Sequence, residues 1–321
     1  MNTLFAYLQA DLEKVNALME DSLKSDIPVL VNCNRHILDH KGKQVRPIVA
    51  LLMARAVSGE CNEDTIRFAA AAELIHNATL LHDDVADNSS SRRGVATIGS
   101  IIGPRPSVLL GDFWLVNGIA RILDGEKSSA RVMRLFGKTL ACLAEGEMLQ
   151  LEMASTGETT EKEYFRIIYD KTATLFETSA LAGAISAGAM AEQELAAAEY
   201  ARCIGYAFQI QDDILDYIGN EAVGKPLGQD LREKKITLPL LGAMKSNAAL
   251  VPEIRQRIVN ISPENVVFVR RFVLENGGIE YARAAAGAYL QKAMDTLKIF
   301  PDGTAKDCLI RLAELLRERN K

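Results

Sequence analysis

Residues 192–218 read EQELAAAEYARCIGYAFQIQDDILDYI, and this stretch decides the fold class. It contains no proline, and its apolar residues Ile204, Ala207 and Ile214 recur at the spacing of one helical face. It belongs to a longer segment, between Pro106 and Pro226, that has no other proline and is rich in Ala, Leu, Met and Glu. Because these residues favour helices and proline interrupts them, the segment predicts several long helices.

The same helical signals extend over the whole chain. The alternation of apolar and polar residues that is typical of strands is nearly absent, so we expect an all-α protein. No Ser/Gly tract or charge block separates two parts, which predicts a single domain over residues 1–321. We expect a large helical bundle, with helices near residues 2–22, 28–40, 45–58, 63–88, 106–123, 128–155, 161–188, 192–218, 235–245, 250–258, 264–276, 278–298 and 303–319.

Composition excludes several classes of protein. The formal net charge of -5 argues against general nucleic-acid binding, which favours a basic face. No apolar run approaches the length of about 18 residues that a transmembrane helix needs, and the N-terminus lacks a signal peptide's basic region and cleavage site. The five cysteines are scattered and never form a C-x-x-C pair. This pattern is typical of reduced thiols and not of zinc ligands, so we expect a cytoplasmic protein.

Two identical acidic motifs end apolar helices of the expected bundle. They are LLHDDVAD, with Asp83, Asp84 and Asp87, and QDDILD, with Asp212, Asp213 and Asp216. In each motif the first and third aspartates are one helical turn apart and share a face. Three carboxylates at a helix C-terminus repel one another and oppose the helix dipole. One such motif alone is often a solvated helix end, but two, each followed by a basic loop, indicate a cation site.

The motifs favour magnesium as that cation. Mg²⁺ binds a few carboxylates, keeps some water ligands and completes its shell with phosphate oxygens. By charge, six aspartates offset about three Mg²⁺ ions. The remaining charge of a bound diphosphate then requires Lys and Arg nearby. The motifs therefore predict a site for a diphosphate together with Mg²⁺.

Basic residues stand where this prediction needs them. Arg92 and Arg93 follow the first motif, and arginine presents a planar fork that suits phosphate oxygens. Lys171 lies in mid-helix among apolar residues, where an unused lysine would be costly. The other basic residues that bear on this prediction are Lys41, Lys43 and Arg46 near the N-terminus and Lys225, Arg232, Lys234 and Lys235 in the Gly-rich loop after the second motif. We interpret Arg232 and Lys234 as solvated surface.

A di-iron site is the alternative that the histidines raise. Glu73 and His76 form an E-x-x-H pair on the helix of the first motif. A di-iron bundle needs a second such pair. The other histidines, His36, His40 and His82, have no glutamate three positions before them. We therefore reject di-iron chemistry.

From Lys41 to Pro239 the chain resembles the trans-isoprenyl diphosphate synthases of the polyprenyl synthetase family, with the pattern of bacterial long-chain, octaprenyl-type members. The most specific parts are IHNATLLHDDVADNSSSRRG and FQIQDDILDYIGNEAVGKPLGQDLREKKITLP. The resemblance implies an isoprenoid synthase fold, a helical bundle with a central substrate cavity. It also implies a homodimer that joins isopentenyl diphosphate to an allylic prenyl diphosphate. A peripheral membrane contact could serve product release.

The resemblance also implies a role for each site residue. Asp83, Asp84, Asp87, Asp212 and Asp216 would hold Mg²⁺, with Asp213 in support. The diphosphate of the allylic substrate would contact Arg92, Lys171, Gln209, Lys225 and Lys235, and the main chain and hydroxyl near Lys171 and Thr172 would stabilise the carbocation. The diphosphate of isopentenyl diphosphate would contact Lys43, Arg46, His76 and Arg93. In this family the departing diphosphate is thought to accept the proton, which explains why no side-chain base stands out.

Three positions depart from the family's pattern. Lys41 stands where the family has the first glycine of G-G-K-R-x-R-P, and Gln44 stands where it has an arginine. Lys234 replaces the usual glycine before the final lysine of the second basic loop. These changes leave every residue of the implied site in place and bear on the affinity for the acceptor.

The residues before the first motif predict the product length. In the family, a bulky aromatic five positions before the first aspartate closes the product tunnel, whereas this chain has Ala78 there and Ile75 beyond it. We therefore expect a product longer than twenty carbons. Five helical residues span about 7.5 Å, so the floor of the tunnel must lie deeper. We hypothesise that Met133 or Phe136 forms it, although packing alone would also explain both residues.

Three alternatives remain for the function. One is a shorter-chain synthase that makes geranylgeranyl or farnesyl diphosphate, and another is a subunit of a heteromeric synthase. Such subunits typically lose motif aspartates, whereas all six are present here. The third is a terpene cyclase, but cyclases usually carry an Asn/Ser/Glu motif second and need no isopentenyl site. The sequence therefore favours a medium- or long-chain prenyltransferase.

Overall fold

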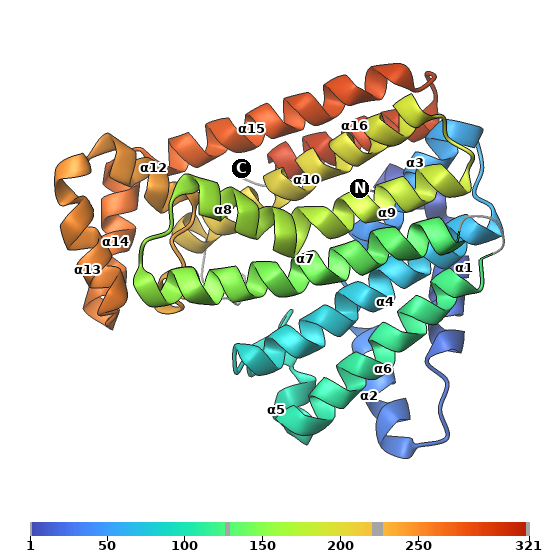
Figure 1. The fold of residues 1–321 in the computed structure, drawn as a ribbon, viewed down its shortest axis with the longest axis horizontal. Coiled ribbons are helices and arrows are strands. Elements are labelled where there is room, and N and C mark those ends of the chain that lie inside the picture. Colours follow the sequence, from blue (N-terminus) through green and yellow to red (C-terminus); the bar gives the residue numbers. More distant parts are fainter. Residues whose placement is uncertain (1, 126–128, 220–226, 319–321) are drawn as a thin grey trace. The chain divides into compact units, whose positions relative to one another are not determined.

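The computed structural model describes residues 2–125, 129–219 and 227–318, and they are almost entirely helical (Figure 1). The expected all-α fold is confirmed. Two compact units are present: Met1–Gly137, Thr178–Ala198 and Ile299–Leu309 form unit 1, and Lys138–Glu177, Glu199–Lys298 and Ile310–Lys321 form unit 2. Four α-helices have residues in both units, namely α7 (Ser129–Thr156), α9 (Thr174–Ser186), α10 (Ala191–Ile218) and α16 (Thr304–Glu318). The expectation of one domain over residues 1–321 stays a prediction.

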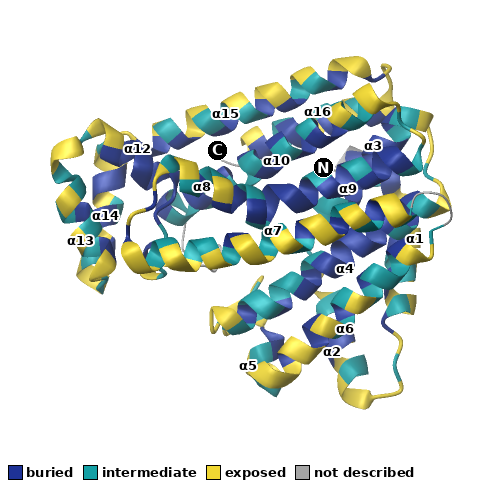
Figure 2. Ribbon diagram, in the orientation of Figure 1, coloured by how far each residue is buried: buried dark blue, intermediate teal, exposed yellow. Residues whose placement is uncertain are grey.

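Unit 1 is built around α4 (Glu63–Ala86), which carries the first acidic motif at its end. Its other elements are α1 (Asn2–Ser22), α2 (Pro28–Asp39), α3 (Val45–Ser58), the strands β1 (Ser91–Arg92) and β2 (Val95–Ala96), α5 (Ile98–Ile102) and α6 (Pro104–Leu123). Figure 2 shows α4 as mainly buried along its length, which its small residues Ala69 to Ala72 permit. Helix α6 packs closely on it, because a Cβ on Gly118 would lie 2.9 Å from Ile75.

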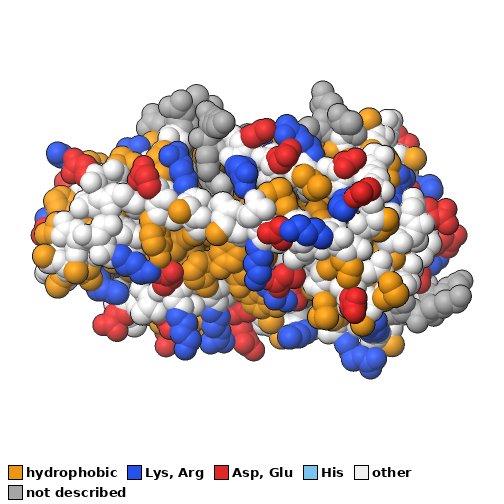
Figure 3. All heavy atoms as spheres, turned by 90° about the horizontal axis from the view of Figure 1, so that it is seen from above, with side chains coloured by type: hydrophobic (Ala, Val, Ile, Leu, Met, Phe, Trp, Pro, Cys, Tyr) orange, Lys and Arg blue, Asp and Glu red, His pale blue; other side chains and the backbone are white. Residues whose placement is uncertain are grey.

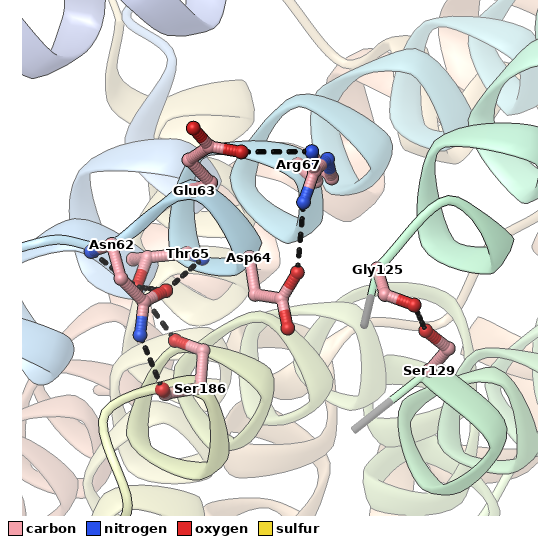
Figure 4. A network of polar contacts seen from close by, with 8 residues as sticks. All are labelled: Asn62, Glu63, Asp64, Thr65, Arg67, Gly125, Ser129 and Ser186. Atoms are coloured by element: carbon pink, nitrogen blue, oxygen red, sulfur yellow. Dashed lines mark hydrogen bonds and ion pairs between the residues drawn. The ribbon is translucent and has the colours of Figure 1, made fainter. Parts of the chain in front are cut away.

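The start of α4 is fixed by a capping box (Figure 4). The side-chain oxygen of Asn62 accepts a hydrogen bond of 2.8 Å from the backbone N–H of Thr65, and its amide donates to the carbonyl of Ser186. The negative charges of Glu63 and Asp64 in the first turn interact favourably with the helix dipole, and both side chains pair with Arg67. The cap sets where α4 begins and therefore where its last turn, with the aspartates, lies in unit 1.

Unit 2 places the second motif in the last turns of α10. Its further elements are α8 (Glu161–Ile168), the π-helix η1 (Tyr169–Ala173), α11 (Gln229–Arg232), α12 (Leu238–Ser246), η3 (Ala248–Leu250), α13 (Val251–Val259), α14 (Pro263–Glu275), α15 (Gly278–Thr296) and η4 (Leu297–Ile299), which ends in unit 1. Ile210, Ile214 and Tyr217 of α10 are fully buried in its hydrophobic core. One side of the helix is therefore held rigidly.

The structure differs from the predicted elements at several short segments. The helix predicted over 161–188 is interrupted by η1, the β1–β2 hairpin and α5 lie between the helices predicted over 63–88 and 106–123, and α11 lies between those predicted over 192–218 and 235–245. The other helix boundaries lie close to the predicted ones. Among the described residues, only α6 is long and apolar enough to cross a membrane, and it contributes buried residues such as Trp114 to the core of unit 1. On the face in Figure 3, acidic and basic side chains are interspersed around hydrophobic ones.

Candidate active site

The first half of the predicted site residues lies at the C-terminal end of α4 in unit 1. Asp83 and Asp84 belong to its last turn and Asp87 is the C-cap residue. Asp84 is only 6% exposed, and Nε of Arg92 donates a hydrogen bond of 2.7 Å to its Oδ1. Burial raises the pKa of Asp84, and the charge of Arg92 opposes that rise. Asp83 is half-buried and Asp87 exposed, so these two carboxylates are more accessible than Asp84.

A strained hairpin carries the two arginines of this half. Strand residue Arg92 pairs with Val95, so Arg93 and Gly94 form a two-residue loop with φ of 53° and 80°. Such loops require two left-handed residues, and for arginine that conformation is unfavourable. In this conformation the Arg93 guanidinium lies against Gly42, where an added Cβ would lie 2.6 Å from Nη2. Its Nη1 donates a hydrogen bond to the carbonyl of His40.

The predicted acceptor residues Arg46, His76 and Arg93 come together in unit 1. Burial lowers the pKa of Arg46 to about 10, and the Glu73 carboxylate opposes that shift. Burial, followed by the charges of Arg46, Arg93 and Arg92, holds the pKa of His76 well below 6.5, so this imidazole is neutral. Lys43 is exposed. The group therefore offers guanidinium charges and an uncharged imidazole, a combination suited to a phosphate.

Sequence reasoning missed the partners of this cluster. Glu73 is 3% exposed and is the counter-charge of Arg46 and Arg93. His36 of α2 donates from Nε2 to the carbonyl of Ala96, 3.0 Å away, and so ties α2 to the hairpin. A cavity of about 60 Å³ lies beside Asp84 and Arg92, with His36 and His40 in its wall. The E-x-x-H spacing places Glu73 beside His76, but its pairing with Arg46 and Arg93 and the contact of His36 with Ala96 join residues far apart in sequence, which no local pattern reveals.

The second half lies in the last turns of α10. Asp213 is 3% exposed and accepts hydrogen bonds from the Tyr164 hydroxyl (2.6 Å, to Oδ2) and from Nε2 of Gln209 (2.9 Å, to Oδ1). Burial raises its pKa to about 7, and the two donors lower it in part. Asp216 accepts from the backbone N–H groups of Gln229 (3.0 Å) and Asp230 (3.1 Å). Asp212 is half-buried.

The allylic residues Lys171 and Thr172 lie in the π-helix η1. π-Helical turns are often found at functional sites because they distort the backbone locally. Two glycines make room for this turn: a Cβ on Gly146 would lie 2.6 Å from Asp170, and one on Gly205 would lie 2.5 Å from Cα of Ala173. The Thr172 hydroxyl donates to Oε1 of Gln209 (2.8 Å), which links η1 to Asp213.

Carboxylates accompany the lysines of this half. Lys171 pairs with Glu147 and Lys235 with Glu233. The predicted ligand Lys225 lies outside the described residues. Four described residues other than glycine have positive φ: Gln44, Asn88, Arg93 and Lys234. All four are in or beside the predicted motifs, as is typical of strain retained for function.

The predicted chain-length residues all belong to unit 1. Ile75 and Ala78 of α4 are fully buried, as is Phe136 of α7, whereas Met133 is half-buried. A small residue at 78 is compatible with a long cavity, and the burial of Phe136 is compatible with either a tunnel floor or plain packing. Their effect on product length stays a prediction.

The acidic residues fit a metal ion that arrives with its ligand. Within residues 2–125, 129–219 and 227–318, no three His, Cys, Asp or Glu side chains converge as a metal-binding group. Mg²⁺ is usually held by one or two carboxylates, waters and substrate phosphates and not by an all-protein cage. Asp83 with Asp87, and Asp212 with Asp216, are such pairs one turn apart. The oxygen donors therefore fit Mg²⁺ bound together with a diphosphate.

Comparisons with known proteins show the family of the chain. The model of the family described as Polyprenyl synthetase matches residues 27–267. The octaprenyl diphosphate synthases of Haemophilus influenzae and Escherichia coli are 40% and 39% identical to the chain, which is covered to 97% in both cases, as are 94% and 96% of those proteins. The crystal structure of a decaprenyl diphosphate synthase from Rhodobacter capsulatus superposes with a TM-score of 0.93 at 34% identity, over 100% of this chain and 99% of that one. A polyprenyl synthase from Caulobacter crescentus, complexed with calcium and isoprenyl diphosphate, gives 0.92 at 33% identity, over 100% and 98%.

Proposed function

Because the chain belongs to the polyprenyl synthetase family and is a prenyltransferase, we propose that it extends an allylic diphosphate, such as farnesyl or geranylgeranyl diphosphate, with successive isopentenyl diphosphate units. The observation that carries the proposal is the pair of aspartate motifs, each with its own cations. Arg46, His76 and Arg93 lie together in unit 1, and Lys171, Thr172 and Gln209 lie beside the second motif in unit 2.

The reaction needs charge stabilisation more than a side-chain base. The allylic C–O bond breaks and its electron pair leaves with the diphosphate. The double bond of isopentenyl diphosphate then forms the new C–C bond. The departing diphosphate accepts the proton that the neighbouring carbon loses as a double bond is restored. Lys171 and Lys235 contact the leaving diphosphate, where their charge matters most as the bond breaks. Thr172, held by Gln209, orients the same end of the substrate.

The acceptor residues hold isopentenyl diphosphate and do not react. Arg46 and Arg93 bind its diphosphate, and His76, which is neutral, donates or accepts a hydrogen bond without adding charge. Because Glu73 offsets part of the guanidinium charge, this half is left with a modest positive charge. That charge favours binding of the diphosphate, and because it is modest, the diphosphate can leave the acceptor residues after the reaction.

Prenyl synthases of this family are generally metal-dependent, and we propose Mg²⁺, about three ions, for this chain. Asp83, Asp84, Asp87, Asp212 and Asp216 would hold it. When bound, Mg²⁺ supplies electrostatic stabilisation of the negative charge that develops on the leaving diphosphate. Asp84 would have to exchange its hydrogen bond with Arg92 for the metal, which frees Arg92 for the allylic diphosphate.

We also propose that the product is a long prenyl chain. The two octaprenyl diphosphate synthases are 40% and 39% identical over nearly the whole chain. Ala78 is fully buried on α4, four residues after the equally buried Leu74 and beside Ile75. A side chain larger than alanine at residue 78 would fill space on the helix that carries the first motif. The shorter-chain alternative predicts a bulky residue here, which the sequence does not contain.

We propose further that two copies of the chain associate through α6. Its residues Leu109, Val116 and Leu123 follow one another at two-turn intervals and are 62%, 63% and 59% exposed. An apolar stripe of this kind marks an interaction surface. Trp114, by contrast, is fully buried and donates to Asn34 (2.8 Å), so it belongs to the core of unit 1. Val116→Glu should shift the protein from dimer to monomer in sedimentation, whereas an unchanged mass would contradict the proposal.

A cytoplasmic location is also proposed, supported by five cysteines that are all free thiols. The long prenyl product would pass to a membrane after release, so peripheral contact is compatible with this location.

One assay tests the proposed function. The purified chain is incubated with Mg²⁺, farnesyl diphosphate and isopentenyl diphosphate, and the dephosphorylated products are measured by mass. We expect an all-trans chain of more than twenty carbons from this protein alone. A cyclic product would indicate a cyclase, and a product only with an added subunit would indicate a heteromeric enzyme. Either outcome contradicts the proposal.

A further inference from the structure

Asp213 differs from Asp212 and Asp216 in the second motif because it is buried and side chains of α8 and α10 hold its two oxygens. The Tyr164 hydroxyl lies 2.6 Å from Oδ2, and Nε2 of Gln209 lies 2.9 Å from Oδ1. With 3% of its surface exposed, the carboxylate has little access to solvent. Asp213 therefore anchors the end of α10 within unit 2, whereas Asp212 and Asp216 are only half-buried.

The donor to this anchor is itself held rigidly. Tyr164 is 3% exposed and belongs to the hydrophobic core that includes Ile210 and Ile214 of α10. The helix that carries it, α8, begins with a capping box in which Glu163 returns to the backbone N–H of Thr160 (3.1 Å). Burial, and then the nearby Asp213 charge, raise the pKa of Tyr164 well above 10, so the hydroxyl keeps its proton and donates.

The contact continues to the allylic residues. Gln209 donates to Asp213 with its amide nitrogen and accepts from the Thr172 hydroxyl with its amide oxygen (2.8 Å). One chain of hydrogen bonds thus runs from Thr172 in η1, through Gln209 and Asp213 of α10, to Tyr164 of α8. A displacement at Tyr164 would change the orientation of Gln209 and Thr172 as well as that of the aspartates.

The net charge of the second motif depends on whether the donor to Asp213 is charged or neutral. Asp212, Asp213 and Asp216 repel one another, and Asp230 adds a fourth carboxyl nearby. A cation at Asp213 would relieve the repulsion but would also cancel charge that the motif needs to attract a metal ion. A neutral hydroxyl steadies the carboxylate by a charge-assisted hydrogen bond and leaves the net charge unchanged.

We propose that Tyr164 is a positioning residue of the prenyl transfer reaction. Its hydroxyl holds Asp213 and Gln209 so that Asp212, Asp216 and Thr172 keep the orientation in which they receive the allylic diphosphate and its metal. The inference rests on the proposed function and concerns only the half of the site in unit 2. The acceptor residues in unit 1 are not part of this hydrogen-bonded chain.

Tyr164→Phe removes the hydroxyl and retains the ring. Tyr200→Phe is the matched control, because Tyr200 is fully buried and lies on α10 near the end opposite the motif. We expect Y164F to raise the Mg²⁺ concentration for half-maximal rate and to lower kcat/KM for farnesyl diphosphate about tenfold, since a hydrogen bond to a charged group is lost. The KM for isopentenyl diphosphate should stay within about twofold of the wild-type value in both variants.

A binding measurement separates positioning from loss of fold. Mg²⁺ with inorganic diphosphate should raise the Tm of the wild type and of Y200F by the same amount, and that of Y164F by less. The double variant Y164F/D213N should lose no more activity than Asp213→Asn alone, because both changes remove one contact. Should Y164F not fold, Asp213→Asn reports on the same contact with the tyrosine ring in place.

Two results have different meanings. If the wild type forms no prenyl product, the proposed function fails. If the wild type is active and Y164F matches Y200F in Mg²⁺ requirement, kcat/KM and Tm shift, the assignment of Tyr164 is wrong.

Discussion

Asp84 and Asp213 occupy the same position in identical motifs, yet the protein balances them differently. Both are almost fully buried, but Asp84 accepts from the charged Arg92 and Asp213 accepts from the neutral Tyr164 and Gln209. A protein cation therefore offsets the charge of Asp84 in the first half-site, whereas Asp213 in the second is held by neutral donors. Two copies of one sequence motif can therefore differ in the charge of the groups that surround their aspartates. The second half depends more strongly on cations that arrive with the ligand.

The largest expected effect comes from breaking the charged pair of the first half. Arg92→Met should lower the free energy of unfolding by about 2–3 kcal/mol, because Asp84 would be left buried without its charged donor. Chemical denaturation without metal or substrate measures this. The control is Arg271→Met, which breaks an exposed pair with Glu275 and should cost less than about 0.5 kcal/mol. Equal losses in the two variants would show that the Asp84 pair is no stronger than a surface one.

The second half should be more sensitive to shape than to charge. Gly205→Ala places a methyl group 2.5 Å from Cα of Ala173 and should lower the free energy of unfolding by about 2 kcal/mol. It should also raise the KM for farnesyl diphosphate, because Lys171 and Thr172 share the displaced π-turn. Gly287→Ala in α15, where a Cβ meets nothing within 4 Å, should instead stabilise by up to about 1 kcal/mol. If Gly205→Ala left the free energy of unfolding unchanged, the π-turn would not depend on this close contact.

The difference between the halves also marks what could be predicted from the sequence. The fold class and the aspartate motifs follow from local spacing, since residues four apart share a helical face. The partners do not: Tyr164 is far from Asp213 in sequence, and nothing in YDKTA distinguishes a π-turn from an α-helix. That turn depends on Gly146 and Gly205, which belong to other helices. The hairpin was missed because its loop has arginine where Asn or Asp would have indicated it.

The electrostatics of the first half can be tested by pH. His76 lies near the charges of Arg46 of α3 and of Arg93 and Arg92 of the hairpin, and burial together with these arginines holds its pKa well below 6.5. The unfolded chain binds a proton at this residue below pH 6.5 and the folded chain does not, so stability falls as the pH drops. At pH 5.5 the loss should be about 1.4 kcal/mol.

The comparison of wild type with His76→Asn isolates this contribution. Denaturation at pH 7.5 and 5.5, without ligands, should give a smaller loss of stability in the variant by about that amount. If both proteins lose the same stability, the imidazole is already protonated in the folded state or is not buried among these charges. The first half would then carry more positive charge than the comparison assumes.

The smallest expected effect concerns strain in the second half. Lys234 has a φ of 58°, the left-handed region, and its backbone N–H bonds to the carbonyl of Leu231 in a tight turn. Lys234→Gly removes the strain of a side chain there but makes the unfolded chain more flexible, and the two effects partly cancel. We expect a net gain of about 0.5 kcal/mol in the free energy of unfolding. Lys24→Gly, at a loop position without positive φ, should have the opposite sign, because no left-handed strain is relieved, the unfolded chain becomes more flexible and the exposed pair with Asp21 is lost. If Lys234→Gly also destabilises the protein, the lysine must make contacts in unit 2 that outweigh its backbone strain, and the second half would then rely on protein charge as the first half does.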